Sequence, residues 1–152
     1  MIVVDASVAI KWYVSEEGSE EALALASGGQ RLVAPDLLFA EVANILWRKA
    51  RLGQLAEAQL RMVPRHLAMA FDQVLPCAEL AGDAVDLAMR LDHPAYDCFY
   101  LALALRLNAP LVSADDRLRR RLAGTPMAAM VVGLGQEAVT PPPSSPPGAP
   151  SR

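Results

Sequence analysis

Short apolar runs alternate with longer, helix-patterned segments along most of the chain. The apolar runs predict strands over residues 2–4, 32–34, 73–76, 110–112 and 127–134. The segments between them predict helices over residues 6–14, 19–27, 36–52, 55–71, 79–91, 94–105 and 116–122. Because strands that alternate with helices are joined by crossover connections, this pattern predicts an α/β fold, with a central parallel sheet of four to five strands covered by helices on both faces.

Two of the predicted helices have unusual patterns. Pro64 removes a backbone donor from the middle of segment 55–71, which is therefore predicted to be either one kinked helix or two shorter ones. The body of the helix that follows Pro94, residues 98–105, has no polar interruption. A helix without a polar face is predicted to be buried on most sides.

The composition fits one compact domain with a tail. The 152 residues are 53% hydrophobic, which is enough to bury one sizeable core, and we expect this core in a domain over residues 1–136. Residues 137–152 are rich in proline and are predicted to form a disordered tail. The net charge of −3 does not favour nucleic acid over the whole molecule, so a phosphate-binding surface would have to be a local cluster of cations.

The sequence lacks the features of exported and membrane proteins. Its first apolar run is interrupted at once by Asp5 and has no basic segment before it, which argues against a signal peptide. No uncharged apolar stretch reaches the roughly 18 residues of a spanning helix. Cys77 and Cys98 belong to no metal-binding or redox spacing, so we expect free thiols in a cytoplasmic protein.

Four acidic residues lie at the ends of predicted strands or in the early parts of predicted helices. Asp5 and Asp115 follow strands, whereas Glu41 and Asp97 lie near the starts of helices. Because the carboxyl ends of parallel strands meet at one edge of a sheet, and helices enter from that edge, we expect the four side chains to converge. Each aspartate alone has a simpler explanation, since it could cap or complement the N-terminus of a helix.

Glu41 is the acid that a structural role explains least well. No lysine or arginine lies three or four residues from it, and its neighbours in the helix are mostly apolar. Asn44, one turn further on, falls on the same face of the helix. Because an unpaired acid is costly to bury, this environment favours a position facing a cavity.

Carboxylates that converge need a counter-ion. Two of them about 4 Å apart repel by roughly 4 kcal/mol at an effective dielectric constant near 20. Because the four acids offer only oxygen ligands, they favour Mg²⁺ or Mn²⁺. Such an ion orients and deprotonates a nucleophile and stabilises the charge that gathers on a phosphodiester. The acids therefore indicate hydrolysis of a nucleic-acid backbone.

Four segments of the chain occur together in an order and spacing that identify a family. They are Ile2–Ser7, the pair Glu41 and Asn44, Tyr96–Ala104, and Leu111–Asp115. Together they resemble the PIN-domain nucleases, and among these the VapC-type toxins of bacterial toxin–antitoxin pairs, over about residues 1–134. The resemblance implies a three-layer α/β/α domain with a divalent cation at the acids and ribonuclease activity on single strands. It also implies a homodimer and a cognate VapB-like antitoxin that covers the active site.

The family pattern assigns a role to each of these polar residues. Asp5, Glu41, Asp97 and Asp115 correspond to the catalytic and metal-binding acids, and Ser7, Asn44, Ser113 and Asp116 to the polar groups that support them. Next to the last acid, the sequence has a dense basic cluster in which Arg117, Arg120 and Arg121 are predicted to bind RNA. A solvated helix face with cations near its C-terminus explains the same cluster equally well.

Other features carry less information. The basic segment 48–51 is typical of the end of a helix, and His66 and His93 lie in no ligand or triad spacing. Haloacid-dehalogenase-type phosphatases also place an acid after the first strand, but they need a second aspartate where this chain has Ser7. A remaining alternative is a PIN-like module that binds RNA or a partner protein without cleaving.

Overall fold

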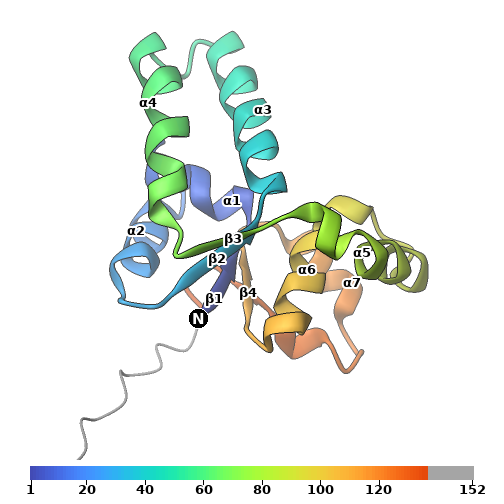
Figure 1. Ribbon diagram of the computed structural model, residues 1–152. Coiled ribbons are helices and arrows are strands. Elements are labelled where there is room, and N and C mark those ends of the chain that lie inside the picture. Colours follow the sequence, from blue (N-terminus) through green and yellow to red (C-terminus); the bar gives the residue numbers. More distant parts are fainter. Residues whose placement is uncertain (137–152) are drawn as a thin grey trace, which may run out of the picture.

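The computed structural model describes residues 1–136, so the predicted tail over 137–152 lies outside the described residues. Five short strands form one sheet: β1 (Ile2–Val4), β2 (Leu32–Pro35), β3 (Gln73–Leu75), β4 (Leu111–Ser113) and β5 (Val131–Gly133). Their order is β3-β2-β1-β4-β5, and every pairing is parallel (Figure 1). The predicted parallel sheet is confirmed.

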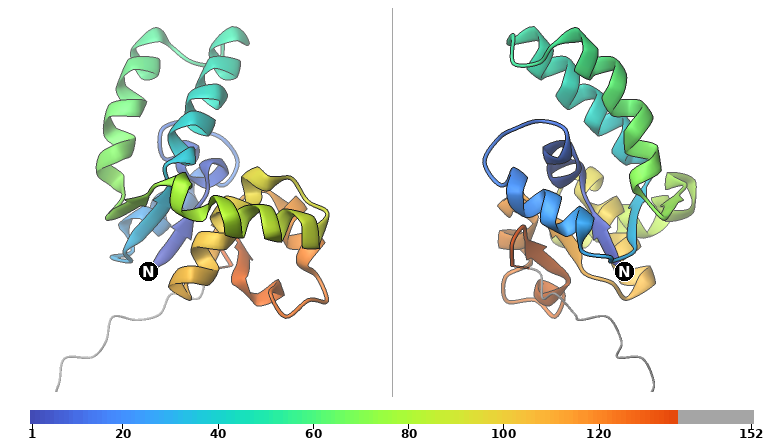
Figure 2. Two further views of the ribbon diagram at one scale, coloured as in Figure 1. Left: turned by 45° about the vertical axis from the view of Figure 1, so that its right-hand side comes forward. Right: turned by 90° about the vertical axis from the view of Figure 1, so that its left-hand side faces the viewer.

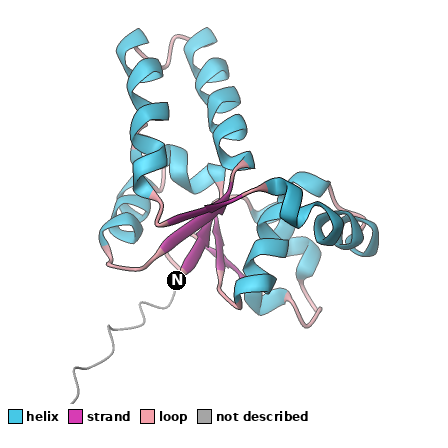
Figure 3. Cartoon of the chain, viewed as in Figure 1, coloured by secondary structure: helices cyan, strands magenta, loops and turns pink. Residues whose placement is uncertain are grey.

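Helices connect the strands and cover both faces of the sheet (Figures 2 and 3). They are α1 (Ala6–Ala9), α2 (Ser19–Ser27), α3 (Leu37–Arg51), α4 (Glu57–Leu67), α5 (Cys77–Leu91), α6 (Ala95–Leu107) and α7 (Asp116–Leu122). Three short 3₁₀ turns are η1 (Ile10–Trp12), η2 (Ala68–Ala70) and η3 (Ala128–Met130). Helix α6 packs on β1, β2 and β4, and α5 packs on α6, whereas α2 lies on the other side of the sheet (Figure 1). This is the predicted three-layer α/β/α arrangement.

Burial follows from the continuous apolar runs of the sequence. Every residue of β1, β2 and β4 is buried, as expected of strands with helices on both faces. In α6, Cys98 and the run from Tyr100 to Ala104 are buried, which confirms the prediction for this helix. Two residues of segment 98–105 are exceptions, since Phe99 is half-buried and Leu105 is 39% exposed.

The structure decides how the segment around Pro64 folds. Helix α4 continues through Pro64 from Glu57 to Leu67, so the alternative of two helices is wrong. Val63 and Leu67, one turn apart on the buried face, are both inaccessible to solvent, whereas Pro64 is exposed. Burial of that face keeps the helix intact although Pro64 cannot donate to the carbonyl of Leu60. Helices α3 and α4 lie side by side and extend beyond the sheet (Figures 1 and 2).

Other predicted boundaries need correction. The strand predicted over 127–134 is only β5, because η3 occupies the residues before it. The helix predicted over 6–14 is the short α1 followed by η1. Helix α3 begins at Leu37, one residue later than predicted, and the carboxylate of Asp36 accepts a hydrogen bond from the backbone N–H of Cys77 (2.9 Å) instead of capping α3. This bond joins the starts of α3 and α5.

Among residues 1–136, the structure has no helix that is both long and apolar enough to cross a membrane.

Candidate active site

The strand order places a crevice between β1 and β4. From β1 the chain moves outward through β2 to β3, and it later returns to β4 on the other side of β1 before moving outward to β5. Ligands of open α/β sheets bind at the carboxyl ends of the strands where the order reverses in this way. Asp5 directly follows β1, and Asp115 lies two residues after β4, so both side chains lie at this crevice.

A cavity of about 250 Å³ lies at this edge of the sheet. Its lining includes all four predicted acids, Asp5, Glu41, Asp97 and Asp115, together with Ser7, Asn44, Arg48, Tyr100 and Arg117. A much smaller cavity, of about 10 Å³, is lined by Asp5, Asp97 and Asp115 and by Ser113. The structure therefore brings together the four acids and three of the four polar residues predicted to support them.

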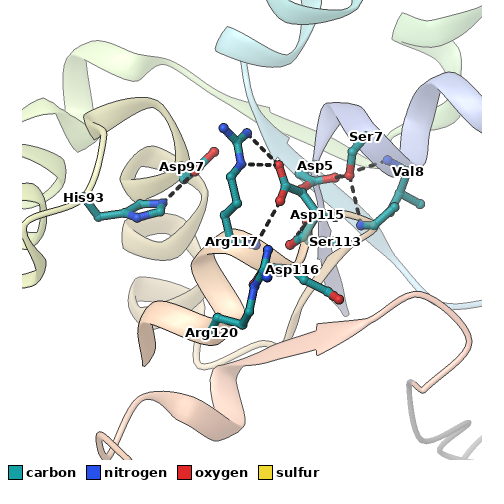
Figure 4. A network of polar contacts seen from close by, with 11 residues as sticks. Asp5, Ser7, Val8, His93, Asp97, Ser113, Asp115, Asp116, Arg117 and Arg120 are labelled. Carbon is teal, nitrogen blue, oxygen red and sulfur yellow. Dashed lines mark hydrogen bonds and ion pairs between the residues drawn. The ribbon is translucent and has the colours of Figure 1, made fainter. Parts of the chain in front are cut away.

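Asp5 is held by hydrogen bonds at the start of α1. Its Oδ1 accepts from the hydroxyl of Ser7 (2.6 Å) and from the backbone N–H of Val8 (3.1 Å; Figure 4). Burial raises the pKa of Asp5 to about 6, although hydrogen bonds from Ser113, Ser7 and Val8 oppose the shift, and the negative charge of Asp97 raises the pKa further. Asp5 is thus both a helix cap and a carboxyl group in a site of unbalanced negative charge.

Ser7 connects two sides of the crevice. While its hydroxyl donates to Asp5, its oxygen accepts a hydrogen bond from the backbone N–H of Ala114 (2.9 Å). Ser113 plays a similar local role, since its hydroxyl oxygen accepts from the backbone N–H of Asp115 (3.0 Å). The two serines fix the loop after β4 relative to the start of α1.

Glu41 faces the cavity from α3, and the phenol of Tyr100 donates a hydrogen bond to its Oε2 (2.5 Å). Burial raises the pKa of Glu41, the bond from Tyr100 opposes this, and the charges of Asp5 and Asp97 raise the pKa further. Burial and the charge of Glu41 raise the pKa of Tyr100, so its hydroxyl keeps the proton that it donates. Glu41 is therefore a more basic carboxylate than a solvated glutamate.

Asp97 lies in the first turn of α6 and is oriented by a histidine. Nε2 of His93 donates to its Oδ2 at 2.7 Å (Figure 4). The His93 side chain is only 9% exposed, whereas that of Asp97 is 32% exposed at the cavity. His93 thus holds one oxygen of Asp97 from the protein side.

Asp115 is paired with an arginine. Its Oδ2 accepts from Nε (2.7 Å) and Nη2 (2.6 Å) of Arg117, and its Oδ1 caps α7 through the backbone N–H of the same residue (2.9 Å; Figure 4). Partial burial opposes ionisation, but the hydrogen bonds and charge of Arg117 lower the pKa of Asp115 below its usual value. The predicted helix cap is present, and the carboxylate also faces the cavity.

Three other predicted residues are oriented elsewhere. Asp116 pairs with Arg119 (2.6 Å) and lines a neighbouring cavity of about 430 Å³. Arg120 donates to the backbone carbonyl of Asp116 (3.3 Å). Arg121 donates to the carbonyl of Leu91 and pairs with Asp92 (3.2 Å), at the end of α5. The structure does not bring Asp116, Arg120 or Arg121 to the lining of the acidic cavity, and their predicted roles stay predictions.

The residues of the cavity have the donor chemistry of a site for a hard divalent cation. Carboxylate, hydroxyl and amide oxygens are the ligands that such ions prefer. Burial is the main cause of the raised pKa values of Asp5 and Glu41, and the charges of neighbouring acids, which a cation would balance, add to it. Within residues 1–136, no three acidic, histidine or cysteine side chains stand close enough together to hold an ion. Asp97 is turned toward His93, and Asp115 is turned toward Arg117. Because the pair with Arg117 is exposed, breaking it to turn Asp115 toward an ion would cost under about 1 kcal/mol.

The sequence interpretation missed three residues of this site. Arg48 belongs to the segment 48–51 that is typical of a helix end, yet it lies seven residues after Glu41, a spacing that places both on one helix face. His93 lies four residues before Asp97, but the proline between them obscured the spacing. Tyr100 has no signal of its own, because an aromatic residue in an apolar helix is typical of the core.

Residues 2–122 match the PIN domain. With its three-layer fold and the acidic cavity at the switch in strand order, the chain belongs to the PIN-domain family. Its curated relatives include the ribonuclease VapC3 of Pyrobaculum aerophilum, 38% identical over 122 residues that cover 79% of this chain and 93% of the relative. The ribonuclease VapC9 of Mycobacterium tuberculosis is 35% identical over 121 residues, covering 78% of this chain and 88% of the relative. Within the PIN-domain family, the chain is thus similar to VapC proteins.

Solved structures support the fold. The crystal structure of PAE2754 from Pyrobaculum aerophilum matches with a TM-score of 0.64 at 22% identity, covering 88% of this chain and 89% of the other. A toxin–antitoxin complex from Klebsiella pneumoniae matches with a TM-score of 0.62 at 16% identity, covering 87% of this chain and 96% of the other. At these identities the likeness establishes the fold.

Proposed function

We propose that the protein is a Mg²⁺- or Mn²⁺-dependent endoribonuclease and the toxin of a VapBC-type toxin–antitoxin pair. It hydrolyses RNA phosphodiester bonds in the cytoplasm and so inhibits translation and growth. The observation that carries the proposal is one cavity lined by four carboxylates from four distant segments. Relatives named VapC ribonuclease, at 35–38% identity over most of the chain, support the same activity.

Each residue of the cavity has a role in this proposal. Asp5, Asp97 and Asp115, together with Glu41, would hold the cation, which when bound supplies Lewis-acid stabilisation of a phosphodiester and lowers the pKa of water. Ser7 and Ser113 keep Asp5 and the loop after β4 in place. Glu41, which lines the cavity and accepts a hydrogen bond from Tyr100, is placed to accept a proton from an attacking water.

The activity is tested on the purified full chain with single-stranded RNA. Cleavage is expected with Mg²⁺ or Mn²⁺, and it is expected to stop with EDTA or with Asp5→Asn or Asp97→Asn. Asp83→Asn is the matched control, because Asp83 is an exposed aspartate of α5 that does not line the cavity. If RNA is bound but never cut under any metal condition, the alternative of a non-catalytic RNA-binding module is correct.

The toxin role needs a partner. We propose that a VapB-like antitoxin covers the cavity and that the protein forms a homodimer. The antitoxin partner is supported by the similarity to VapC proteins and by the structural likeness to a chain of a toxin–antitoxin complex. Induction of the protein is expected to arrest growth, and co-expression of a small protein encoded beside its gene is expected to relieve the arrest. Growth arrest that persists in the Asp97→Asn variant would contradict the link between toxicity and cleavage.

A further inference from the structure

The end of α3 has three basic residues, and within residues 1–136 only one of them lacks a partner. Lys49 pairs with Glu16 (2.5 Å), and the guanidinium of Arg51 lies over the ring of Trp47, 5.6 Å from its centre. Arg48 lines the acidic cavity, and with the described residues it makes neither a hydrogen bond nor an ion pair. An arginine is always charged, so this is a free cation on the wall of a cavity dominated by carboxylates.

Helix geometry places Arg48 in line with the acidic site. Residues three, four and seven apart share one face of an α-helix, so Glu41, Asn44 and Arg48 form a row along α3. Seven residues correspond to two turns, or roughly 10 Å along the helix axis. The row runs from the acid cluster toward the exposed end of α3, and Arg48 is itself exposed.

The other arginine at this cavity, Arg117, is held by an ion pair with Asp115. Two nitrogens of Arg117 bind Oδ2 of Asp115, at 2.7 and 2.6 Å. A polyanion that approaches four carboxylates is repelled unless cations meet it, and a free guanidinium can bind a phosphate through two parallel hydrogen bonds. Among the described residues that line the cavity, Arg48 is the arginine that makes no hydrogen bond and no ion pair, so its whole guanidinium is available to a phosphate.

We infer that Arg48 is an RNA-binding residue that holds a backbone phosphate of the strand whose scissile phosphate lies at the acid cluster. The RNA strand then lies along α3, past Asn44, and Arg48 contributes to affinity for any sequence because phosphate contacts carry no base information. This inference rests on the proposed ribonuclease function and assigns its substrate path.

The test compares Arg48→Ala and Arg48→Lys with Arg51→Ala, which removes the same charge one turn away and outside the cavity. Binding of a fluorescein-labelled oligouridylate to the full chain is measured by anisotropy at several salt concentrations, with Ca²⁺ in place of Mg²⁺. Arg48→Ala is expected to weaken binding by about three- to tenfold at low salt. It is also expected to reduce the slope of log affinity against log salt by about 0.7, the value for one phosphate contact on a single strand.

The variants separate a phosphate contact from a general change of charge. Arg48→Lys is expected to keep the wild-type salt slope, and Arg51→Ala to keep both the slope and the affinity. If Arg48→Ala binds RNA as wild type does, the inference is overturned while the ribonuclease proposal stands. If this variant binds RNA normally but no longer binds the antitoxin, Arg48 is a contact for the protein partner instead. If the wild type neither binds nor cuts RNA, the ribonuclease proposal itself fails.

Discussion

At the scale of single residues, the pKa of an acid in this site depends on how far burial raises it and how far hydrogen bonds and nearby cations lower it. Asp5 accepts hydrogen bonds from Ser7 and Val8 and still has its pKa raised to about 6, because burial outweighs these bonds. Asp115 has the opposite shift, since Arg117 outweighs the effect of its partial burial. Two aspartates of one cavity therefore differ in basicity because of their immediate neighbours.

The raised pKa of Asp5 predicts how the metal-free protein responds to pH. A carboxyl group whose pKa is higher in the folded state favours folding most below its unfolded pKa, near 3.8, and this stability is lost as the pH rises through about 6. Asp5→Asn cannot ionise, so in EDTA its free energy of unfolding is expected to exceed that of wild type by about 1–3 kcal/mol near pH 8.

Urea titrations of wild type and Asp5→Asn at several pH values check this prediction. The difference between the two proteins isolates Asp5 from other groups that titrate in the same range. It is expected to grow between about pH 4 and pH 6 and then to level off. A difference in free energy of unfolding that stays constant across this range would show that burial does not raise the pKa of Asp5.

A second prediction concerns the phenol that binds Glu41. Tyr100→Phe removes the donor to Oε2, and because that hydrogen bond opposes the raised pKa of Glu41, its loss raises the pKa further. The acid limb of the pH–activity profile is expected to move to higher pH, with activity reduced most on the acid side. Tyr96→Phe, an exposed tyrosine of the same helix, is the control. Superimposable profiles for wild type and Tyr100→Phe would contradict this role.

The acids could be predicted from sequence because each stands out against apolar neighbours at a strand end or a helix start. Their partners could not, because a contact such as Tyr100 to Glu41 joins residues 59 positions apart and depends on how α6 packs against the sheet. Arg48 shows a different limit. Its spacing from Glu41 was visible, but a basic segment is also typical of a helix end, and the sequence alone does not separate Arg48 from Lys49 and Arg51.

At the scale of elements, tertiary burial overrides local propensity. Helix α4 contains Pro64 in its interior, where the missing donor leaves the carbonyl of Leu60 without its helical partner. The helix persists because Val63 and Leu67 are buried on the same side. From sequence alone one helix and two helices were equally plausible, since the strength of that burial depends on the neighbouring elements.

Pro64 gives a test of this balance. Because its side chain is exposed, Pro64→Ala restores a backbone hydrogen bond without opening a cavity, and it is expected to raise the free energy of unfolding by about 1–3 kcal/mol. Arg65→Ala, at the next exposed position, is expected to change it by less than about 0.5 kcal/mol. Thermal or urea unfolding checks both variants. Destabilisation by Pro64→Ala would mean that the proline ring is part of the packing.

At the scale of the whole molecule, strand order creates the site. The alternation of strands and helices was enough to predict a parallel sheet in three layers. It did not determine the order β3-β2-β1-β4-β5, in which β1 and β4 are neighbours with the crevice between them. That order depends on long-range pairing, such as Val3 with Leu111, and it is what brings Asp5 and Asp115 together.

The net charge of −3 is consistent with a local and not a global attraction for RNA. Negative charge is gathered in one cavity, and on its wall Arg48 is the cation whose donors are free among the described residues. A divalent ion at the acids and a phosphate at Arg48 would make this surface complementary to a nucleic-acid backbone. The metal comes first in this scheme, because without it the carboxylates repel the substrate.

Titration calorimetry of Mn²⁺ into the full-length protein, without RNA, tests this central claim most directly. Wild type and Asp83→Asn are expected to show the same saturable binding. Asp97→Asn is expected to bind Mn²⁺ at least about tenfold more weakly, because it replaces one negatively charged carboxylate ligand with a neutral amide. Absence of binding by the wild type, or equal binding by Asp97→Asn, would contradict the assignment of the four acids to a metal site.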